Sequence, residues 1–407
     1  MSSNSLLKIR TFAIVLFAVA SALFFLRYIH DGVKSIPGYD FRLRYHEVEC
    51  IRRGIDPYDI VTKKLPSDEF ALFATPEALP GVKTLHVYTP WEYTYFLPFS
   101  LLSEKASGAL FLGLSVLALV GISVYAYHLV QKYNGNVLDG IFAASAVLLL
   151  RECCWRAVRR RQLWRVECLD DFANGLGTTA KHEVLAGIAW AFLMIKPQIG
   201  LLFAIPLLLR KQFVTIGVVV SICILCMIPP ALMCGRNPLV MLLEVPRGCA
   251  FVAADNGTML IPSQVFRALA GRVDPGLLGL LSMMVGAGIC LYLTWRMRGQ
   301  TDWLIILSPI VVCALLWSYC KPHDRVILWV TQLLLALFAL RTDKPYARWF
   351  CFLMLLLTAW PFLPDVGSLV KLLRRVSLAG LLVFCWWMPR LSFHRVPQDI
   401  PGELGGS

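Results

Sequence analysis

Charged residues are scarce in this chain. Asp, Glu, Lys and Arg make up 16% of its 407 residues, whereas hydrophobic residues make up 57%. A soluble domain with so apolar a composition would expose more apolar surface than water tolerates. The composition therefore excludes an ordinary soluble fold, and no separate soluble domain is visible. We expect residues 1–407 to form one integral membrane domain with lipid as its solvent.

Long apolar runs recur along the whole chain, and each is near the roughly 20 residues that a helix needs to cross hydrocarbon. They predict an all-α, polytopic membrane bundle of about 10 transmembrane helices. The expected spans are 11–29, 107–130, 184–209, 213–234, 276–295, 303–319, 324–340, 346–363 and 375–389, with a weaker one that ends near Leu150. No small-residue cleavage site follows the first run, so we interpret it as a membrane helix rather than a signal peptide.

The net charge of +13 is explained largely by short basic connections between the spans. Under the positive-inside rule these connections and both termini lie in the cytoplasm of a multi-pass protein of the plasma (inner) membrane. The segments 30–106, 235–275 and 320–323 then face outward. Because no basic and aromatic reading surface or binding motif is present, we expect no nucleic-acid partner.

Residues 151–182 are unlike their surroundings, since Arg and Cys are dense there. If the weak span is real, this cluster lies outside, against the positive-inside rule. Two interpretations stay open. The segment is either a surface amphipathic helix that binds anionic lipid, or a translation-frame artefact that replaces an ordinary apolar segment.

The first outward segment, 30–106, carries a clear local pattern. Apolar residues at helical spacing, followed by a glycine, predict a short amphipathic helix over 39–53 at the outer membrane interface. The stripe and its stop are Phe41, Tyr45, Val48, Ile51 and Gly54. Asp40 falls in the first turn, where the helix dipole favours an ionised carboxylate. From spacing alone, Asp40 is either a helix cap or a functional acid.

Two further stretches of this segment have turn or aromatic character. Residues 56–59, Asp-Pro-Tyr-Asp, predict a turn closed by an Asp side chain. Residues 88–99 are rich in aromatics and Pro, and most of these aromatics are expected to anchor at the headgroups.

Polar residues also interrupt the apolar runs. Lys196 lies near the middle of a predicted span together with Pro197 and Gln198, and a cation at that depth costs about 2.5–3.5 kcal/mol on insertion scales. Lys196 is therefore either a functional residue or a structural lysine paired inside the bundle. Residues 319–325 are too polar for an indifferent turn: Lys321 and Arg325 suit a phosphate, and His323 or Asp324 suits a hydroxyl or a proton. A solvated turn with an Asp cap is the alternative.

The third outward segment contains Asn256-Gly257-Thr258, which matches a glycosylation acceptor and equally suits a polar loop that contacts substrate. The chain shows no dense set of carboxylates, so we expect no metal and no cofactor.

With these residues placed, the chain resembles a GT-C membrane glycosyltransferase and is most similar to glycosyltransferase family 87. This family comprises the polyprenol-phosphate-mannose-dependent α-mannosyltransferases and bacterial relatives. The likeness runs from about residue 11 to 340 and is carried by Asp40, Tyr45, residues 54–58, 88–90 and 97–99, Lys196-Pro197 and residues 256–258. The chain departs from the family at 151–182, where relatives commonly carry an apolar segment.

The resemblance implies a hexosyltransferase of the cell envelope. It would transfer a sugar from a polyprenyl-phosphate donor to an extracytoplasmic lipid or glycan acceptor, and in this family the sugar is mannose. The resemblance also implies a catalytic Asp in the first outward loop, which corresponds to Asp40. The expected substrate-binding residues are Arg44, Tyr45, Asp56, Tyr58, Tyr88, Lys196, Gln198, Asn256, His323, Asp324 and Arg325. Two other classes stay open: a transporter or flippase, although no internal repeat is detected, and a non-catalytic lipid-binding or assembly protein.

Overall fold

The computed structural model describes residues 3–34, 39–58, 89–134, 136–149, 180–245, 275–300, 303–317, 327–342, 344–359 and 368–387. Within these ranges all regular secondary structure is helical, so the all-α prediction is confirmed. The elements are α1 (Ser3–Lys34), α2 (Tyr39–Arg52), α5 (Pro90–Phe96), η1 (Leu97–Leu101), α6 (Glu104–Asn134), α7 (Val137–Leu149), α10 (Ala180–Leu193), α11 (Pro197–Gly200), η3 (Leu201–Phe203), α12 (Ala204–Leu209), α13 (Phe213–Met233), α16 (Pro275–Arg296), α17 (Trp303–Trp317), α18 (Trp329–Arg341), α19 (Pro345–Ala359) and α20 (Ser368–Trp387).

Each predicted span is helical in its described part, except that the span 184–209 is interrupted at residues 194–196. Three helices of this part, α1, α6 and α13, are long and apolar enough to cross a membrane by length and composition. On α1, Phe12, Leu23 and Leu26 are 70%, 62% and 61% exposed, and such a row of exposed apolar side chains suits contact with lipid. The prediction of about ten crossings goes beyond these three helices and stays a prediction.

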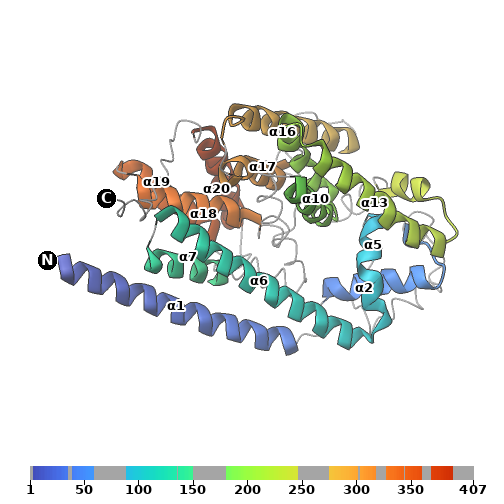
Figure 1. Ribbon diagram of the computed structural model, residues 1–407, viewed down its shortest axis with the longest axis horizontal. Helices are drawn as coiled ribbons and strands as arrows, with labels where there is room; N and C mark the ends of the chain where they lie inside the picture. The colour runs from blue at the N-terminus through green and yellow to red at the C-terminus, as the bar shows by residue number, and fades with distance from the viewer. Residues whose placement is uncertain are drawn as a thin grey trace, which may run out of the picture.

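Figure 1 shows how the helices are grouped. The long helices α1 and α6 follow one side of the molecule, and α7 packs against both of them. Among the later helices, α17 contacts α16, α18 and α20, and α18 and α20 both contact α19. At the opposite end from α19, the short helix α5 packs against α13 and α2.

The short elements α2, α5 and η1 have a hydrophobic core of their own, separate from the large core of the bundle. Its centre is an aromatic cluster of Phe41, Phe96, Phe99 and Phe111, whose ring centroids lie between 5.3 and 6.4 Å apart. Burying one Phe stabilises a fold by about 1.5–3 kcal/mol, and each ring pair adds about 0.5–1.5 kcal/mol. This cluster fixes α2 against the first turns of α6.

The predicted apolar stripe of α2 is confirmed, because Phe41, Val48 and Ile51 are all buried. It packs on protein, however, so a place of this helix at the membrane interface stays a prediction. Two aromatics that we expected at the headgroups, Trp91 and Tyr93, are likewise buried within the protein. Their burial overturns that expectation for these two residues, since rings packed in a core do not face headgroups.

Gly54 ends α2, as predicted. Its φ is 77°, and the N–H groups of Gly54 and Ile55 each donate to carbonyls of α2, Ile51 and Cys50, at 2.9 Å. These two bonds form a Schellman motif, in which the left-handed residue is usually Gly. The chain then turns from α2 towards the end of α13, whose Met233 carbonyl lies 3.4 Å from the position of a Cβ on Gly54.

Replacing Gly54 with Ala should destabilise the protein, because a side chain in the left-handed region costs about 1–2 kcal/mol. The matched control is Gly113→Ala in α6, where a Cβ meets nothing within 4 Å and Ala is the better helix former by about 0.8–1 kcal/mol. We expect a lower melting temperature in detergent for Gly54→Ala and an unchanged or higher one for Gly113→Ala. Equal shifts of the same sign would contradict this account of the turn.

Candidate functional site

A buried ion pair joins α2 to α5. The Nε of Arg44 donates to Oε1 of Glu92 at 2.6 Å, and the two side chains are 3% and 1% exposed. The guanidinium also lies over the ring of Phe96, with its carbon 5.5 Å from the ring centroid. Because a charge buried alone is costly, each partner requires the other in this position.

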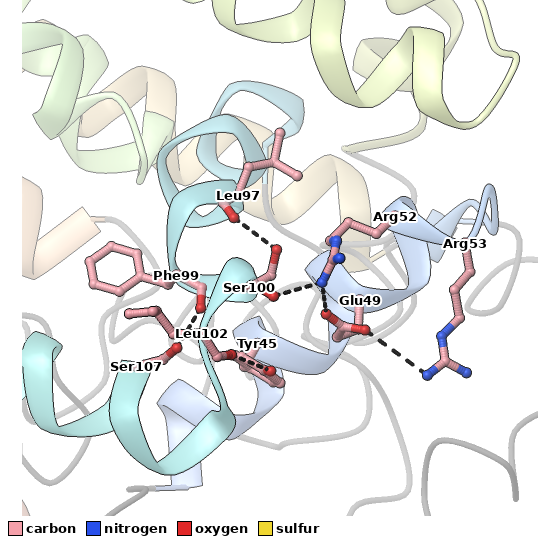
Figure 2. Close-up of polar contacts among 9 residues, drawn as sticks. All are labelled: Tyr45, Glu49, Arg52, Arg53, Leu97, Phe99, Ser100, Leu102 and Ser107. Carbon is pink, nitrogen blue, oxygen red and sulfur yellow. Dashed lines mark hydrogen bonds and ion pairs between the residues drawn. The ribbon is translucent and has the colours of Figure 1, made fainter.

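Side chains of α2 donate hydrogen bonds to backbone carbonyls in η1 and directly after it (Figure 2). The hydroxyl of Tyr45 donates to the Leu102 carbonyl at 2.8 Å, and Arg52 donates to the Ser100 carbonyl at 2.6 Å. Arg52 is in turn paired with Glu49 at 2.6 Å. The last carbonyls of a helix lack partners within it, so these side chains satisfy groups that would otherwise need water. Burial, followed by the nearby Glu49 carboxylate, raises the pKa of Tyr45, which keeps its phenol a neutral donor.

Two more ion pairs fix the ends of this segment. Near its start, Arg42 is paired with Glu104 at the beginning of α6, at 2.6 Å. Past its end, the carboxylate of Asp56 accepts the N–H of Tyr58 at 2.9 Å and the Nε of Arg236 at 2.8 Å. The first bond is the predicted Asx-type turn, which is thereby confirmed. The second ties this turn to the chain that leaves α13.

The predicted span 184–209 is broken at Lys196. Helix α10 ends at Leu193, and Lys196 has φ −110° and ψ 88° before Pro197 begins α11. Proline cannot donate a backbone hydrogen bond and disfavours the helical region for the residue before it, which is sufficient to break the helix here. The Lys196 side chain is buried, at 7% exposure.

Two Trp indoles donate hydrogen bonds to backbone carbonyls on either side of the break. The indole of Trp190 donates to the Gly200 carbonyl at 2.8 Å, and the indole of Trp91 in α5 donates to the Met194 carbonyl at 2.9 Å. Broken helices are tolerated at membrane depth where other protein groups satisfy the freed backbone. The Trp91 bond therefore places α5, and with it the Arg44–Glu92 pair, next to the break that contains Lys196.

Other predicted site residues have the following places. Asp40 lies in the first turn of α2, as expected, and Gln198 lies in α11; both statements concern the backbone. Tyr58 is fully buried, and its ring packs edge-on against Tyr93 with centroids 6.2 Å apart. Tyr45, Asp56 and Tyr58 thus contact protein groups, and a role for them in substrate binding stays a prediction.

Several predicted residues lie outside the described ranges: Tyr88, Asn256, Lys321, His323, Asp324, Arg325 and residues 151–179 of the Arg- and Cys-rich segment. In the described part of the chain, no group of three or more His, Cys, Asp or Glu residues could hold a metal ion.

Sequence reasoning missed three residues of this site: Glu47, Trp91 and Glu92. Glu47 is fully buried, three residues after Arg44 on the same face of α2. Glu92 was missed because it lies in the aromatic run 88–99, which we interpreted as a belt at the headgroups. The available signal was Arg44 itself, since an Arg on the buried face of an amphipathic helix requires a nearby carboxylate.

Residues 86–322 match the family model of glycosyltransferase family 87, which is more than half of the chain. The chain therefore belongs to glycosyltransferase family 87, as its resemblance predicted, and its apolar helices fit a membrane glycosyltransferase. The matched segment contains Glu92 and Lys196, begins after Asp40 and ends before His323. No curated protein and no solved structure matches the chain.

Removing Arg44 should leave Glu92 as a buried carboxylate without its counter-ion, so we expect Arg44→Met to cost about 3–5 kcal/mol of stability. Adding Glu92→Gln should restore part of this loss, because the stranded charge is then gone. The control is Arg53→Met, whose guanidinium is 62% exposed and lies 4.0 Å from Glu49, an arrangement worth about 0–1 kcal/mol. Unfolding in detergent measures all three. Similar losses for Arg44→Met and Arg53→Met would contradict the assignment.

Proposed function

We propose that this glycosyltransferase moves a hexose, specifically mannose, from a polyprenyl-phosphate donor to an extracytoplasmic lipid or glycan acceptor, with inversion at the anomeric carbon. Family membership supports glycosyl transfer over transport. The observation that carries the proposal is the hydrogen bond from Trp91 to Met194, because it joins the segment of α2 and α5 to the helix break at Lys196. One compact region then offers both a carboxylate for the acceptor and a cation for the donor phosphate.

In the proposed reaction, Asp40 is the base. It takes the proton of the acceptor hydroxyl while the hydroxyl oxygen attacks the anomeric carbon on the face opposite the phosphate. The bond between that carbon and the phosphate oxygen breaks, and polyprenyl phosphate departs with the electron pair. Inversion follows from the single displacement. Helical spacing puts Asp40 on the same face of α2 as Arg44 and Glu47, four and seven residues later, which supports this role.

The leaving phosphate needs positive charge. Among the described cations we choose Lys196 as the candidate, because it lies at the helix break that the Trp91 bond places next to α5. Lys196 lies at a break in a helix within the bundle, and because its side chain is buried, a phosphate binds there only when the groups that cover it move. This role accounts for the cost of keeping a lysine at such a depth. Lys321 and Arg325 are the other candidates from the sequence.

The proposed orientation follows from the basic connections, which put both chain ends in the cytoplasm and the segment of α2 and α5 outside. A polyprenyl-phosphate sugar carries its reactive carbon at the headgroup level of that leaflet. The membrane then delivers the donor to the site, and the base need not cross hydrocarbon to reach it.

Asp40→Asn should reduce sugar transfer by about 10² to 10⁴-fold, the usual contribution of one positioned base. The assay measures the consumption of radiolabelled polyprenyl-phosphate-mannose by membranes that contain the protein together with their own lipids. Asp31→Asn in α1 is the control, since Asp31 is exposed to solvent beside Arg27 and lies outside the site. An Asp40→Asn protein with full transfer would remove Asp40 from the mechanism.

Lys196→Gln should weaken binding of the donor and slow transfer by about 10 to 100-fold, because a hydrogen bond to a charged group contributes about 1.5–3 kcal/mol. Lys196→Arg should restore part of the activity. The control is Lys105→Gln, which removes an exposed lysine at the start of α6. Donor binding that is the same in Lys196→Gln and Lys105→Gln would exclude Lys196 as the phosphate ligand.

A further inference from the structure

Thr89 and Glu92 have the spacing of a capping box but do not form one. In a capping box the Thr hydroxyl accepts the N–H three residues on, and the Glu side chain accepts the N–H of the Thr. Here the hydroxyl of Thr89 makes no capping bond, the N–H of Glu92 donates to the Thr89 carbonyl at 2.9 Å, and the Glu92 carboxylate binds Arg44. Neither side chain therefore caps the N-terminus of α5.

Each of these side chains keeps one buried polar atom without a partner. Oγ1 of Thr89 and Oε2 of Glu92 have no hydrogen bond within the described part of the chain, and the two residues are 2% and 1% exposed. Buried polar atoms are almost always bonded, since leaving one unsatisfied destabilises the fold. Two such atoms three residues apart point to a ligand that supplies the missing groups.

The chemistry of the two atoms selects the ligand. An ionised carboxylate only accepts hydrogen bonds, whereas a Thr hydroxyl both donates and accepts. A sugar hydroxyl can donate to Oε2 of Glu92 and accept from Thr89. A phosphate cannot, because it would meet the negative carboxylate at close range. Arg44 meanwhile holds the other oxygen of Glu92 in place.

We propose that Thr89 and Glu92 bind a hydroxyl of the transferred sugar or of the acceptor. This inference rests on the proposed function. The location agrees with it, because Trp91, between these two residues, is bonded to Met194, two residues before Lys196. A glycosyl group whose phosphate lies at Lys196 is then adjacent to this pair. Since both atoms are shielded, the ligand selects a state in which the side chains that cover them have moved.

The decisive variant is Thr89→Val, which removes the hydroxyl, keeps the shape of the side chain and leaves the Arg44–Glu92 pair intact. The matched control is Thr94→Val on the same helix, because the Thr94 hydroxyl already donates to the Cys226 carbonyl. The purified full-length protein is tested for binding of polyprenyl-phosphate-mannose and of polyprenyl phosphate without sugar. Transfer is measured in parallel with increasing amounts of a membrane lipid extract as acceptor.

If the pair binds the donor sugar, Thr89→Val weakens binding of polyprenyl-phosphate-mannose by about tenfold but not binding of polyprenyl phosphate, the effect expected for one lost hydrogen bond. If it binds the acceptor, donor binding is unchanged and the apparent KM for the extract rises by about tenfold. Glu92→Gln shifts the same quantity in the same direction. Thr94→Val shifts neither.

Suppose that the wild-type protein transfers the sugar, and that Thr89→Val and Thr94→Val show the same donor binding and the same apparent KM. That result would overturn this inference and leave the proposed function standing. A wild-type protein that neither binds nor consumes the donor would overturn the proposed function, and this inference with it.

Discussion

The pairing of Arg44 with Glu92 joins two residues that lie 48 positions apart in the sequence, inside a part of the protein without access to water. Apolar packing alone would allow α2 and α5 to slide or rotate against each other, since one hydrophobic contact can replace another of similar size. A buried ion pair does not allow this, because any shift leaves two charges unpaired. The relative position of these helices is thus set by a polar contact. The aromatic cluster adds stabilisation through the burial of its rings.

Directional polar contacts also fix α5 against its other neighbours. Three hydrogen-bonding side chains of α5, from Trp91, Glu92 and Thr94, each reach a different element: α10, α2 and α13. A helix of seven residues therefore connects the first segment of the chain to the broken helix at Lys196. Most other contacts in the bundle are apolar and lack direction. Several polar contacts of the site lie where helices break, begin or end, as do those of Trp91 with Met194, Arg42 with Glu104 and Asp56 with Arg236. In a membrane protein, polar groups are tolerated where the protein itself satisfies them.

Local features of this fold could be predicted from the sequence, because each depends on neighbouring residues. Periodicity indicated the helices, Gly54 the end of α2 and Asp56 its turn. The break before Pro197 was not predicted, because the apolar run 184–209 was expected to form one span. The contacts that build the site join distant residues, and no periodicity reports them. Trp91 shows the difficulty: an aromatic residue in a Pro-rich stretch suits a headgroup belt as well as a buried hydrogen bond to a broken helix. Family likeness indicated glycosyl transfer and Asp40, but it gave no sign that Glu92 would be the partner of Arg44.

The central claim is that α2, α5 and the break at Lys196 form one site for a lipid-borne sugar. A structure of the full chain in a lipid nanodisc with polyprenyl-phosphate-mannose bound tests it most directly. We expect density for the phosphate beside Lys196 and for the sugar between α2 and α5, near Asp40. Density for the sugar against α18 and α19 instead, away from α5, would contradict it.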